Sequence, residues 1–425
     1  MTLRNKRIFA VMLLLGSLCY FQARSLRQVR EIAFAMDLVE QGYVEPVDRH
    51  ALYATAMKAM LGSLDRYSGF VQKDDFDRMN RIIEQQFGGV GILLEQPAIN
   101  GPLRVVSPLF NTPAMRAGIQ PGDAILEVDG NPTIGWDIDQ AISRLTGIAG
   151  TAVRLKIERK GFTSPIELEL VRAEIETESV QGDRRRDDGS WSFQLEEHSG
   201  IGYVKVDSFG SKTAEECRRA IESIAGKIDG LVLDLRSNPG GLLTAATDIC
   251  DFFLDDGPIV STRGRDDWRQ STIQATKGTL LPSNVPLAVL IDGGSASASE
   301  VVAACLQDRQ RAIVVGERSF GKGSVQNIIP LEGNREAMKL TTARYYPPSG
   351  RNIDRKGNDS QETQWGVVPD PGMDVQLTEL QRSQWAFLQR DRNIWKNGSL
   401  EEPPAPPLVD AVLERAVQAL TPSSK

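Results

Sequence analysis

The feature that most constrains the fold of this chain is a serine-rich turn between an apolar strand and a helix. The run Val285–Ile291 has the length and composition of a buried strand, and Val301–Leu306 has the apolar spacing of a helix. The segment between them, Gly294–Glu300, reads GSASASE. A serine at this turn would lie beside a helix N-terminus, where backbone N–H groups favour developing negative charge.

The residues of this turn allow two interpretations. Ser297 and Glu300 have the three-residue spacing of a capping box, a common way to begin a helix. Ser297 could instead be a nucleophile, which needs a base to accept its proton. The chain contains only two histidines, His50 and His198, and neither lies near a motif. A lysine is the known substitute for histidine in this role.

Lys322 is the candidate base, because it lies in a segment that is apolar and rich in glycine. An unperturbed lysine has a pKa of about 10.4, so a base at neutral pH needs a pKa about three units lower. Burial can supply that change without a carboxylate partner. In an extended segment Lys322, Ser324 and Gln326 would share one face, and the Gln326 amide could then orient the amine.

The same lysine also suggests a phosphate-binding loop, because Gly316–Lys322 fits the first seven positions of a Walker A motif. The eighth position should be Ser or Thr to hold magnesium, and it is Gly323 here. A helix should follow, whereas Val325–Pro330 has the composition of a strand. The sequence therefore predicts no nucleotide and no other cofactor. It also predicts no metal, because no group of His, Cys and carboxylate residues has ligand spacing along the chain.

Four segments together resemble one family of peptidases, the C-terminal processing peptidases or tail-specific proteases. The similarity runs from about Ala33 to Asp370, and the order and spacing of the motifs match. The segments are GSASASEVVAACLQD (Gly294–Asp308), AIVVGERSFGKGSVQ (Ala312–Gln326), LTTARYYPPSGRNI (Leu340–Ile353) and GVVPD (Gly366–Asp370).

The resemblance implies a role for each candidate residue. It makes Ser297 the nucleophile, Lys322 the general base and Gln326 the residue that positions the lysine. It also implies a backbone oxyanion hole at Ala298 and Gly241. The apolar run before Gly241 independently reads as a buried strand that ends in turn residues and two glycines, which let N–H groups approach a substrate closely. An ordinary strand-to-helix turn would have the same pattern.

Residues 86–173 resemble a second module, a PDZ domain. The block Asn111–Gly130 is its specific mark, and a helix and the strand Val153–Arg159 follow it. In such domains a glycine loop offers N–H groups to the C-terminal carboxylate of a peptide, and the peptide adds a strand beside it. The resemblance assigns this binding to Gly88, Gly89, Val90, Gly91 and Ile92.

The N-terminus has the pattern of an export signal or a membrane anchor, because basic residues precede the apolar run Ile8–Phe21. As a helix this run reaches about 21 Å, short of the ~30 Å hydrocarbon core, which favours a signal peptide. Phe21 is a poor residue for cleavage after Ala23, so an uncleaved anchor stays open. We expect a protein exported to the bacterial cell envelope, with membrane contact through residues 8–23 if cleavage does not occur.

Length and composition agree with two globular modules and helical ends. The chain has 425 residues, of which 41% are hydrophobic, and its net charge of −7 argues against binding to nucleic acid. Strands are expected in the α/β core, with a mixed, partly parallel sheet, at Ile201–Val206, Leu231–Leu235, Leu287–Ile291 and Ala312–Val315. The predicted regions are a signal or anchor at 1–24, helices at 25–85, the PDZ module at 86–173, the protease core at 174–395, and a proline-rich connector with a last helix at 396–425.

These observations predict a serine endopeptidase that captures apolar C-terminal tails of proteins or peptides and cleaves them through an acyl-enzyme. The alternative is a catalytically silent, membrane-tethered PDZ adaptor that binds tails without cutting them. The presence of Ser297, Lys322 and Gln326 argues against the adaptor. Nothing in the sequence specifies an oligomeric state.

Overall fold

The computed structural model of the protein describes residues 27–96, 101–186, 188–265, 270–331, 336–355, 365–393 and 409–421. The expected signal or anchor and the proline-rich connector lie outside these residues. The chain divides into two compact units, residues 1–76 with 326–341, and residues 77–325 with 342–425. None of the described helices combines the length and the apolar character that a membrane span requires.

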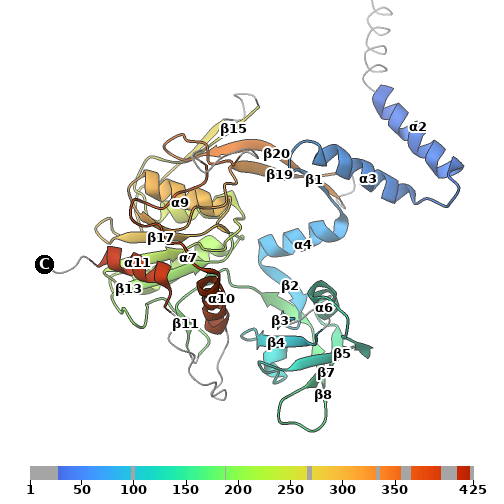
Figure 1. Ribbon diagram of the computed structural model, residues 1–425, viewed down its shortest axis with the longest axis horizontal. Helices are drawn as coiled ribbons and strands as arrows, with labels where there is room; N and C mark the ends of the chain where they lie inside the picture. Colours follow the sequence, from blue (N-terminus) through green and yellow to red (C-terminus); the bar gives the residue numbers. More distant parts are fainter. Residues whose placement is uncertain are drawn as a thin grey trace, which may run out of the picture. The chain divides into compact units, whose positions relative to one another are not determined.

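The first unit begins with helices, as expected for this region, and Figure 1 labels them. Each of the two ends at a glycine, and the Asp48 side chain begins the second by accepting the N–H of His50 at 2.8 Å. The helices are α2 (Arg27–Gly42) and α3 (Arg49–Gly62). The short apolar core of this unit contains Ala54, Leu61 and Phe70.

One element of the first unit is not a helix, although a helical region was expected at residues 25–85. Gly69–Val71 forms strand β1, which pairs antiparallel with the first residues of β20 (Ala337–Tyr346). Strand β19 (Ser324–Pro330) also pairs with β20. The partner strand comes from far along the chain, so the local pattern could not reveal it. Helix α4 (Lys73–Glu84) then leads into the second unit.

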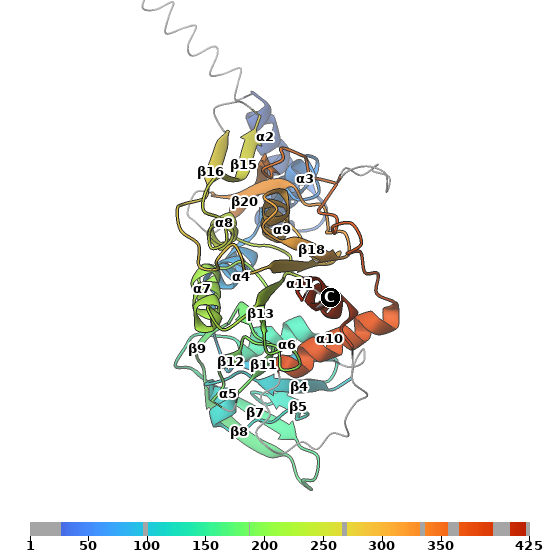
Figure 2. The same cartoon turned by 90° about the vertical axis from the view of Figure 1, so that its left-hand side faces the viewer.

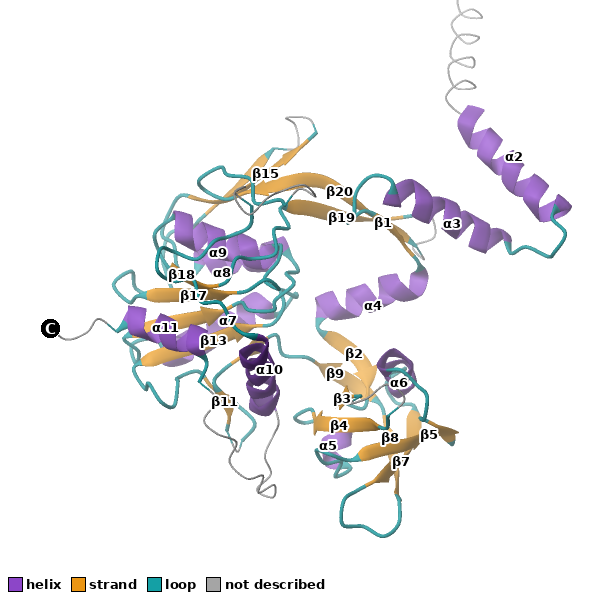
Figure 3. Cartoon of the chain, in the orientation of Figure 1, coloured by secondary structure: helices purple, strands orange, loops and turns teal. Residues whose placement is uncertain are grey.

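The first part of the second unit is a sheet covered by short helices, as expected for the PDZ module (Figure 3). Its buried residues include Leu103, Ile125 and Ile157. The strand order is β3 (Ile92–Glu95), β4 (Leu103–Pro108), β5 (Ala124–Val128), β7 (Ala152–Glu158) and β8 (Ile166–Val171), with β6 (Asn131–Pro132) beside β5. The helices are α5 (Pro113–Arg116) and α6 (Ile138–Leu145).

A two-stranded ribbon joins this module to the rest of the second unit. Its strands, β2 (Gln86–Gly89) and β9 (Ala173–Glu176), pair antiparallel along their whole length. The expected helix and the expected strand at Val153–Arg159 are confirmed by α6 and β7.

The larger part of the second unit is an α/β core with a mixed sheet, which confirms the predicted fold class. Its order is β10 (Val180–Gln181), β13 (Ile201–Val206), β14 (Gly230–Asp234), β17 (Leu287–Ile291) and β18 (Ile313–Gly316). The last four are parallel, and β10 is antiparallel to β13. All four strands expected from their apolar runs are therefore present, within one residue at each end.

Helices cover both faces of this sheet, which explains why its strands are apolar throughout. Alternate strand residues pack on the two sides, with Val204 and Val289 on one and Tyr203 and Leu290 on the other. On the first side lie α7 (Thr213–Ile224), α8 (Leu243–Asp251) and α9 (Ala298–Asp308). On the other lies α11 (Ala411–Leu420), as Figure 2 shows.

The remaining elements of the second unit lie around this sheet. They are the hairpin β11 (Arg184–Arg185) and β12 (Trp191–Ser192), the hairpin β15 (Pro258–Gly264) and β16 (Ser271–Gln274), and helix α10 (Glu379–Asn393). Strand β15 pairs with the last residues of β20. The carboxyl ends of β14, β17 and β18 meet at one edge of the sheet, where α/β proteins place their sites.

Candidate active site

The serine-rich turn follows β17 at this edge. The Asp292 carboxylate shapes it by accepting the N–H groups of Gly294 at 2.9 Å and Ser295 at 3.1 Å. Ser295 Oγ donates to Leu235 O at 2.8 Å, which ties the turn to the end of β14. Ser297 is 6% exposed and has φ +58° and ψ −112°, a conformation that serine rarely adopts. Strained strand-to-helix turns of this kind present nucleophiles in other hydrolases.

Glu300 joins this turn to the segment that carries the lysine. The expected capping contact is confirmed, because Glu300 Oε2 accepts the N–H of Ser297 at 2.9 Å. The same oxygen accepts the N–H of Lys322 at 2.7 Å, and Oε1 accepts the N–H of Gly321 at 2.7 Å and the hydroxyl of Ser319. Glu300 has no exposed surface. Burial raises the pKa of its carboxyl, and these four hydrogen bonds oppose that rise.

The main chain of Lys322 therefore lies close in space to the serine turn, since the main-chain N–H groups of Lys322 and Ser297 donate to the same Glu300 oxygen. Gly321 has φ +84°, and a Cβ there would lie 2.8 Å from Trp365. Gly323 donates its N–H to Asp354 Oδ1 at 3.1 Å. The residues after the lysine form strand β19 and not a helix, which confirms the strand expected at Val325–Pro330.

The glycine pair after β14 lies against the serine turn. A Cβ at Gly240 would lie 2.8 Å from Ser297 Cβ and 3.0 Å from Ala298 N, so only glycine allows this approach. Gly240 donates its N–H to Asn238 Oδ1 at 2.8 Å, and Asn238 O accepts the Ala296 N–H at 3.0 Å. The structure thus brings together Ser297, Ala298 and the glycine pair that includes Gly241.

Tyr345 is a site residue to which the sequence analysis assigned no role. It is 4% exposed, and its hydroxyl is hydrogen-bonded to the Ser297 side chain. Burial raises the pKa of this hydroxyl, and the bond to Ser297 opposes the rise. The Tyr345 N–H donates to Gly323 O at 2.7 Å, directly after the lysine. The sequence shows Tyr345 only as part of a motif, because tertiary pairing brings it to the serine.

Gln326 lies in the first unit, on β19. Its Nε2 donates to Thr341 Oγ1 at 3.5 Å, and the Thr341 N–H donates to Ser68 Oγ at 3.1 Å. These contacts hold β19 and β20 together near the loop before β1. The expected action of Gln326 on Lys322 stays a prediction.

The glycine loop of the PDZ module is closely packed. Val90 is 2% exposed within the module's core, and Ile92 packs against that core. A Cβ at Gly88 would lie 2.1 Å from Gly147 O, and one at Gly91 would lie 2.4 Å from Thr112. Gly89 ends β2 beside this loop. Peptide binding by these residues stays a prediction.

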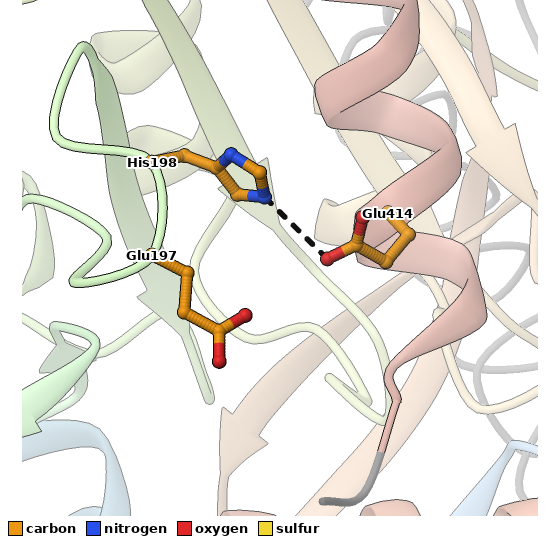
Figure 4. A group of neighbouring side chains, drawn as sticks. All are labelled: Glu197, His198 and Glu414. Atoms are coloured by element: carbon orange, nitrogen blue, oxygen red, sulfur yellow. Dashed lines mark ion pairs between the residues drawn. The ribbon is translucent and has the colours of Figure 1, made fainter.

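Among the described residues, Glu197, His198 and Glu414 lie close enough together to hold a metal ion, a grouping that spacing along the chain does not reveal. His198 Nε2 lies 3.5 Å from Glu414 Oε1, and Glu197 is adjacent (Figure 4). The sequence could not show this because Glu414 belongs to α11. His198 precedes β13 and so lies at the amino end of the sheet, whereas Ser297 follows the carboxyl end of β17. This position makes His198 a poor candidate for the base.

Comparison with known families and proteins gives consistent matches. Residues 200–370 match peptidase family S41, and residues 104–159 match the PDZ domain. The carboxy-terminal-processing protease of Bartonella bacilliformis is 40% identical over 78% of this chain and 74% of its own length. The carboxyl-terminal-processing protease of Synechocystis sp. is 32% identical over 75% of this chain and 73% of its own length.

Among solved structures, the photosystem II D1 C-terminal processing protease is similar to this chain. It is 27% identical, with a TM-score of 0.45, and the match covers 80% of this chain and 86% of that one.

Proposed function

The chain belongs to peptidase family S41 and is a C-terminal processing serine protease with a PDZ domain, and we propose that Ser297 and Lys322 form its catalytic dyad. The observation that carries this proposal is the Glu300 carboxylate, whose Oε2 accepts the main-chain N–H of both residues. A single buried group thereby fixes the nucleophile turn and the lysine segment relative to each other. Such fixed geometry is what proton transfer between a nucleophile and its base requires.

In this mechanism the Lys322 amine accepts the Ser297 proton as Oγ attacks the scissile carbonyl. The tetrahedral intermediate collapses to an acyl-enzyme when the leaving amine takes a proton from the lysine. Water then attacks the ester, again with Lys322 as base. The Tyr345 hydroxyl contacts the Ser297 side chain before the reaction begins.

The oxyanion of the intermediate would lie between the N–H groups of Ala298 and Gly241. Ala298 is the first residue of α9, so its N–H points out of the helix N-terminus. The Gly240 N–H is already bonded to Asn238, which favours Gly241 as the second donor. One such donor typically contributes about 3 kcal/mol to lowering the barrier.

Substrate capture belongs to the PDZ domain in this proposal. We propose that the N–H groups of the loop Gly88–Ile92 bind the terminal carboxylate of a protein with an apolar tail. The basic and apolar N-terminus supports export of the enzyme to the cell envelope. Sequencing the N-terminus of the protein recovered from fractionated cells tests this location.

The dyad is tested with Ser297→Ala and Lys322→Ala, measured on a protein with an apolar C-terminal tail. Each change should abolish cleavage, while a fluorescent tail peptide should bind as tightly as before. The wild-type rate should rise towards alkaline pH as the lysine loses its proton. Undiminished cleavage by either variant would refute the dyad, and a rate governed by a group titrating near about 6.5 would indicate histidine. Tail binding by a wild-type protein that cleaves nothing would support the PDZ adaptor.

A further inference from the structure

A buried glutamine lies where the PDZ domain joins the core. Gln85 is 2% exposed and has φ +55°, directly before β2. Its Nε2 donates to Thr177 O and to Glu216 Oε1, both at 3.2 Å, and its Oε1 accepts the Lys212 N–H at 2.8 Å. Gln85 belongs to the connection that enters the PDZ domain, and Thr177, after β9, belongs to the connection that leaves it. The Gln85 side chain therefore links these two connections, and through Glu216 it also contacts the core helix α7.

The same side chain holds the loop 208–213, which leads from β13 into α7. Besides the bond from Lys212, the Ser211 N–H donates to Ile83 O at 2.8 Å. A Cβ at Gly210 would lie 2.5 Å from Gln85 Oε1, so the loop and the glutamine are in close contact. One side of the loop is therefore fixed by the chain segment that enters the PDZ domain.

The other side of this loop holds the glycine pair of the proposed oxyanion hole. Phe209 is 1% exposed, its N–H donates to Gly240 O at 3.1 Å, and its carbonyl accepts the Leu242 N–H at 2.7 Å. These two bonds flank Gly241. A Cβ at Gly241 would lie 2.2 Å from Phe209 O, which shows how tightly the two main chains pack.

We infer that Gln85 is a positioning residue for catalysis, which fixes the Gly241 N–H through the loop 208–213. The inference rests on the proposed role of Gly241. An oxyanion donor must lie within about 2.7–3.1 Å of the oxygen it stabilises, so a small displacement of the loop weakens catalysis without changing the dyad. Through Gln85, the ribbon β2 and β9 that carries the PDZ domain and the oxyanion loop share one hydrogen-bond network.

The test is Gln85→Met, which keeps the length of the side chain and removes its polar atoms. The control is Gln194→Met, since Gln194 Nε2 also makes two hydrogen bonds, to Ser199 O at 3.2 Å and Lys227 O at 3.3 Å, but at the amino end of β13. In the full-length enzyme kcat should fall roughly 10- to 100-fold for Gln85→Met, with KM within about threefold of wild type. The control should keep its kcat.

A merely structural role for Gln85 would change different quantities. Loss of activity in proportion to the folded fraction, or an equal loss in Gln194→Met, would overturn the inference, and so would an unchanged kcat in Gln85→Met. Ser297→Ala separates this result from the mechanism. If that change abolishes cleavage and Gln85→Met does not slow it, the dyad stands and only the positioning role fails.

A second pair of variants changes the contact between Gln85 and the loop 208–213 by a substitution in the loop. It tests the inference even if Gln85→Met does not fold. Gly210→Ala pushes against Gln85 Oε1, whereas Gly200→Ala pushes against Asp229 Oδ2, which a Cβ would approach to 2.7 Å. A Cβ at Gly200 meets only the end of the Asp229 side chain, whereas one at Gly210 also approaches Gln85 Cγ and Cδ to 2.6 and 2.7 Å and must displace that side chain. Urea unfolding checks that both variants fold. Only Gly210→Ala should lower kcat, by about threefold to tenfold. Equal kcat in the two alanine variants would contradict the inference.

Discussion

Asp234 and Glu300 are two carboxylates with no exposed surface near the same edge of the core sheet, and they have opposite surroundings. Asp234 ends β14 and binds the Arg236 guanidinium through both oxygens. Glu300 accepts hydrogen bonds from three main-chain N–H groups and one hydroxyl. Burial alone would raise both pKa values. Arg236 outweighs burial at Asp234 and lowers its pKa, while the pKa of Glu300 stays raised.

This difference indicates that Asp234 supports the fold, whereas Glu300 places the residues of the site. Arg236 also binds both oxygens of Asp410 at 2.8 Å, which anchors the start of α11 to the end of β14. The attraction between Arg236 and the two carboxylates, with their hydrogen bonds, offsets part of the cost of burying these charges. Glu300 instead spans two loops that carry proposed catalytic residues. Its two oxygens together accept hydrogen bonds from both loops.

The largest expected effect is that of Glu300→Gln. The amide nitrogen cannot accept a hydrogen bond, so one pair of donors loses its acceptor and the two loops lose their common contact. We expect kcat/KM on a tail-bearing protein to fall by at least about 100-fold. Binding of a tail peptide to the PDZ domain serves as the control and should not change. Activity within tenfold of wild type would mean that Glu300 is only a helix cap.

Asp410→Asn tests the other side of the comparison. The substitution keeps an oxygen at the start of α11 and removes the negative charge that faces Arg236. The free energy of unfolding should therefore fall by about 2 kcal/mol. The rate per folded molecule should stay unchanged. Urea unfolding and kcat measure the two quantities. Asp256→Asn is the matched control, because Asp256 binds Arg309 with an 84% exposed side chain and should contribute nothing measurable. A loss of kcat in Asp410→Asn would show that this cluster also places the site, which contradicts the proposed difference from Glu300.

Stability should depend on pH with opposite signs at the two carboxylates. The pKa of Asp234 is lowered by folding, so its contribution is complete above its unfolded pKa of about 3.9 and is lost as pH falls through the folded pKa. The pKa of Glu300 is raised, so stability falls as pH rises from about 4.3 through the folded pKa. The difference in unfolding free energy between wild type and Asp234→Asn, and between wild type and Glu300→Gln, measures each slope. Slopes of equal sign would contradict the assignment.

The smallest expected effect is a loss of local stability in the PDZ domain, where a second buried carboxylate is paired with an arginine. Arg159 binds both oxygens of Asp123 at 2.7 Å, and Asp123 is 1% exposed. Lysine cannot make this two-point contact, so Arg159→Lys should cost about 1 kcal/mol of local stability. Hydrogen exchange of the β5 and β7 amides measures it. Arg154→Lys, in an exposed pair with Glu169, should leave exchange unchanged.

Much of this architecture could be predicted because its signals are local. The apolar runs of β13, β14, β17 and β18 mark buried parallel strands, and the Ser297 and Glu300 spacing marks the start of α9. The family follows from the order of the motifs. Strand β1 was the exception within the expected helical region. It has only three residues, too few to show a period, and its partner β20 is far along the chain.

The sequence by itself determined the fold class, the PDZ domain and the candidate pair of Ser297 and Lys322, since each depends on residues that are near one another in the chain. Only the tertiary structure decided what connects them. It made one Glu300 oxygen a contact for both segments, brought Tyr345 to the serine, and linked Gln85 to Gly241 through Phe209. These contacts join distant segments, and a buried polar group finds its partners only when the chain has folded around it.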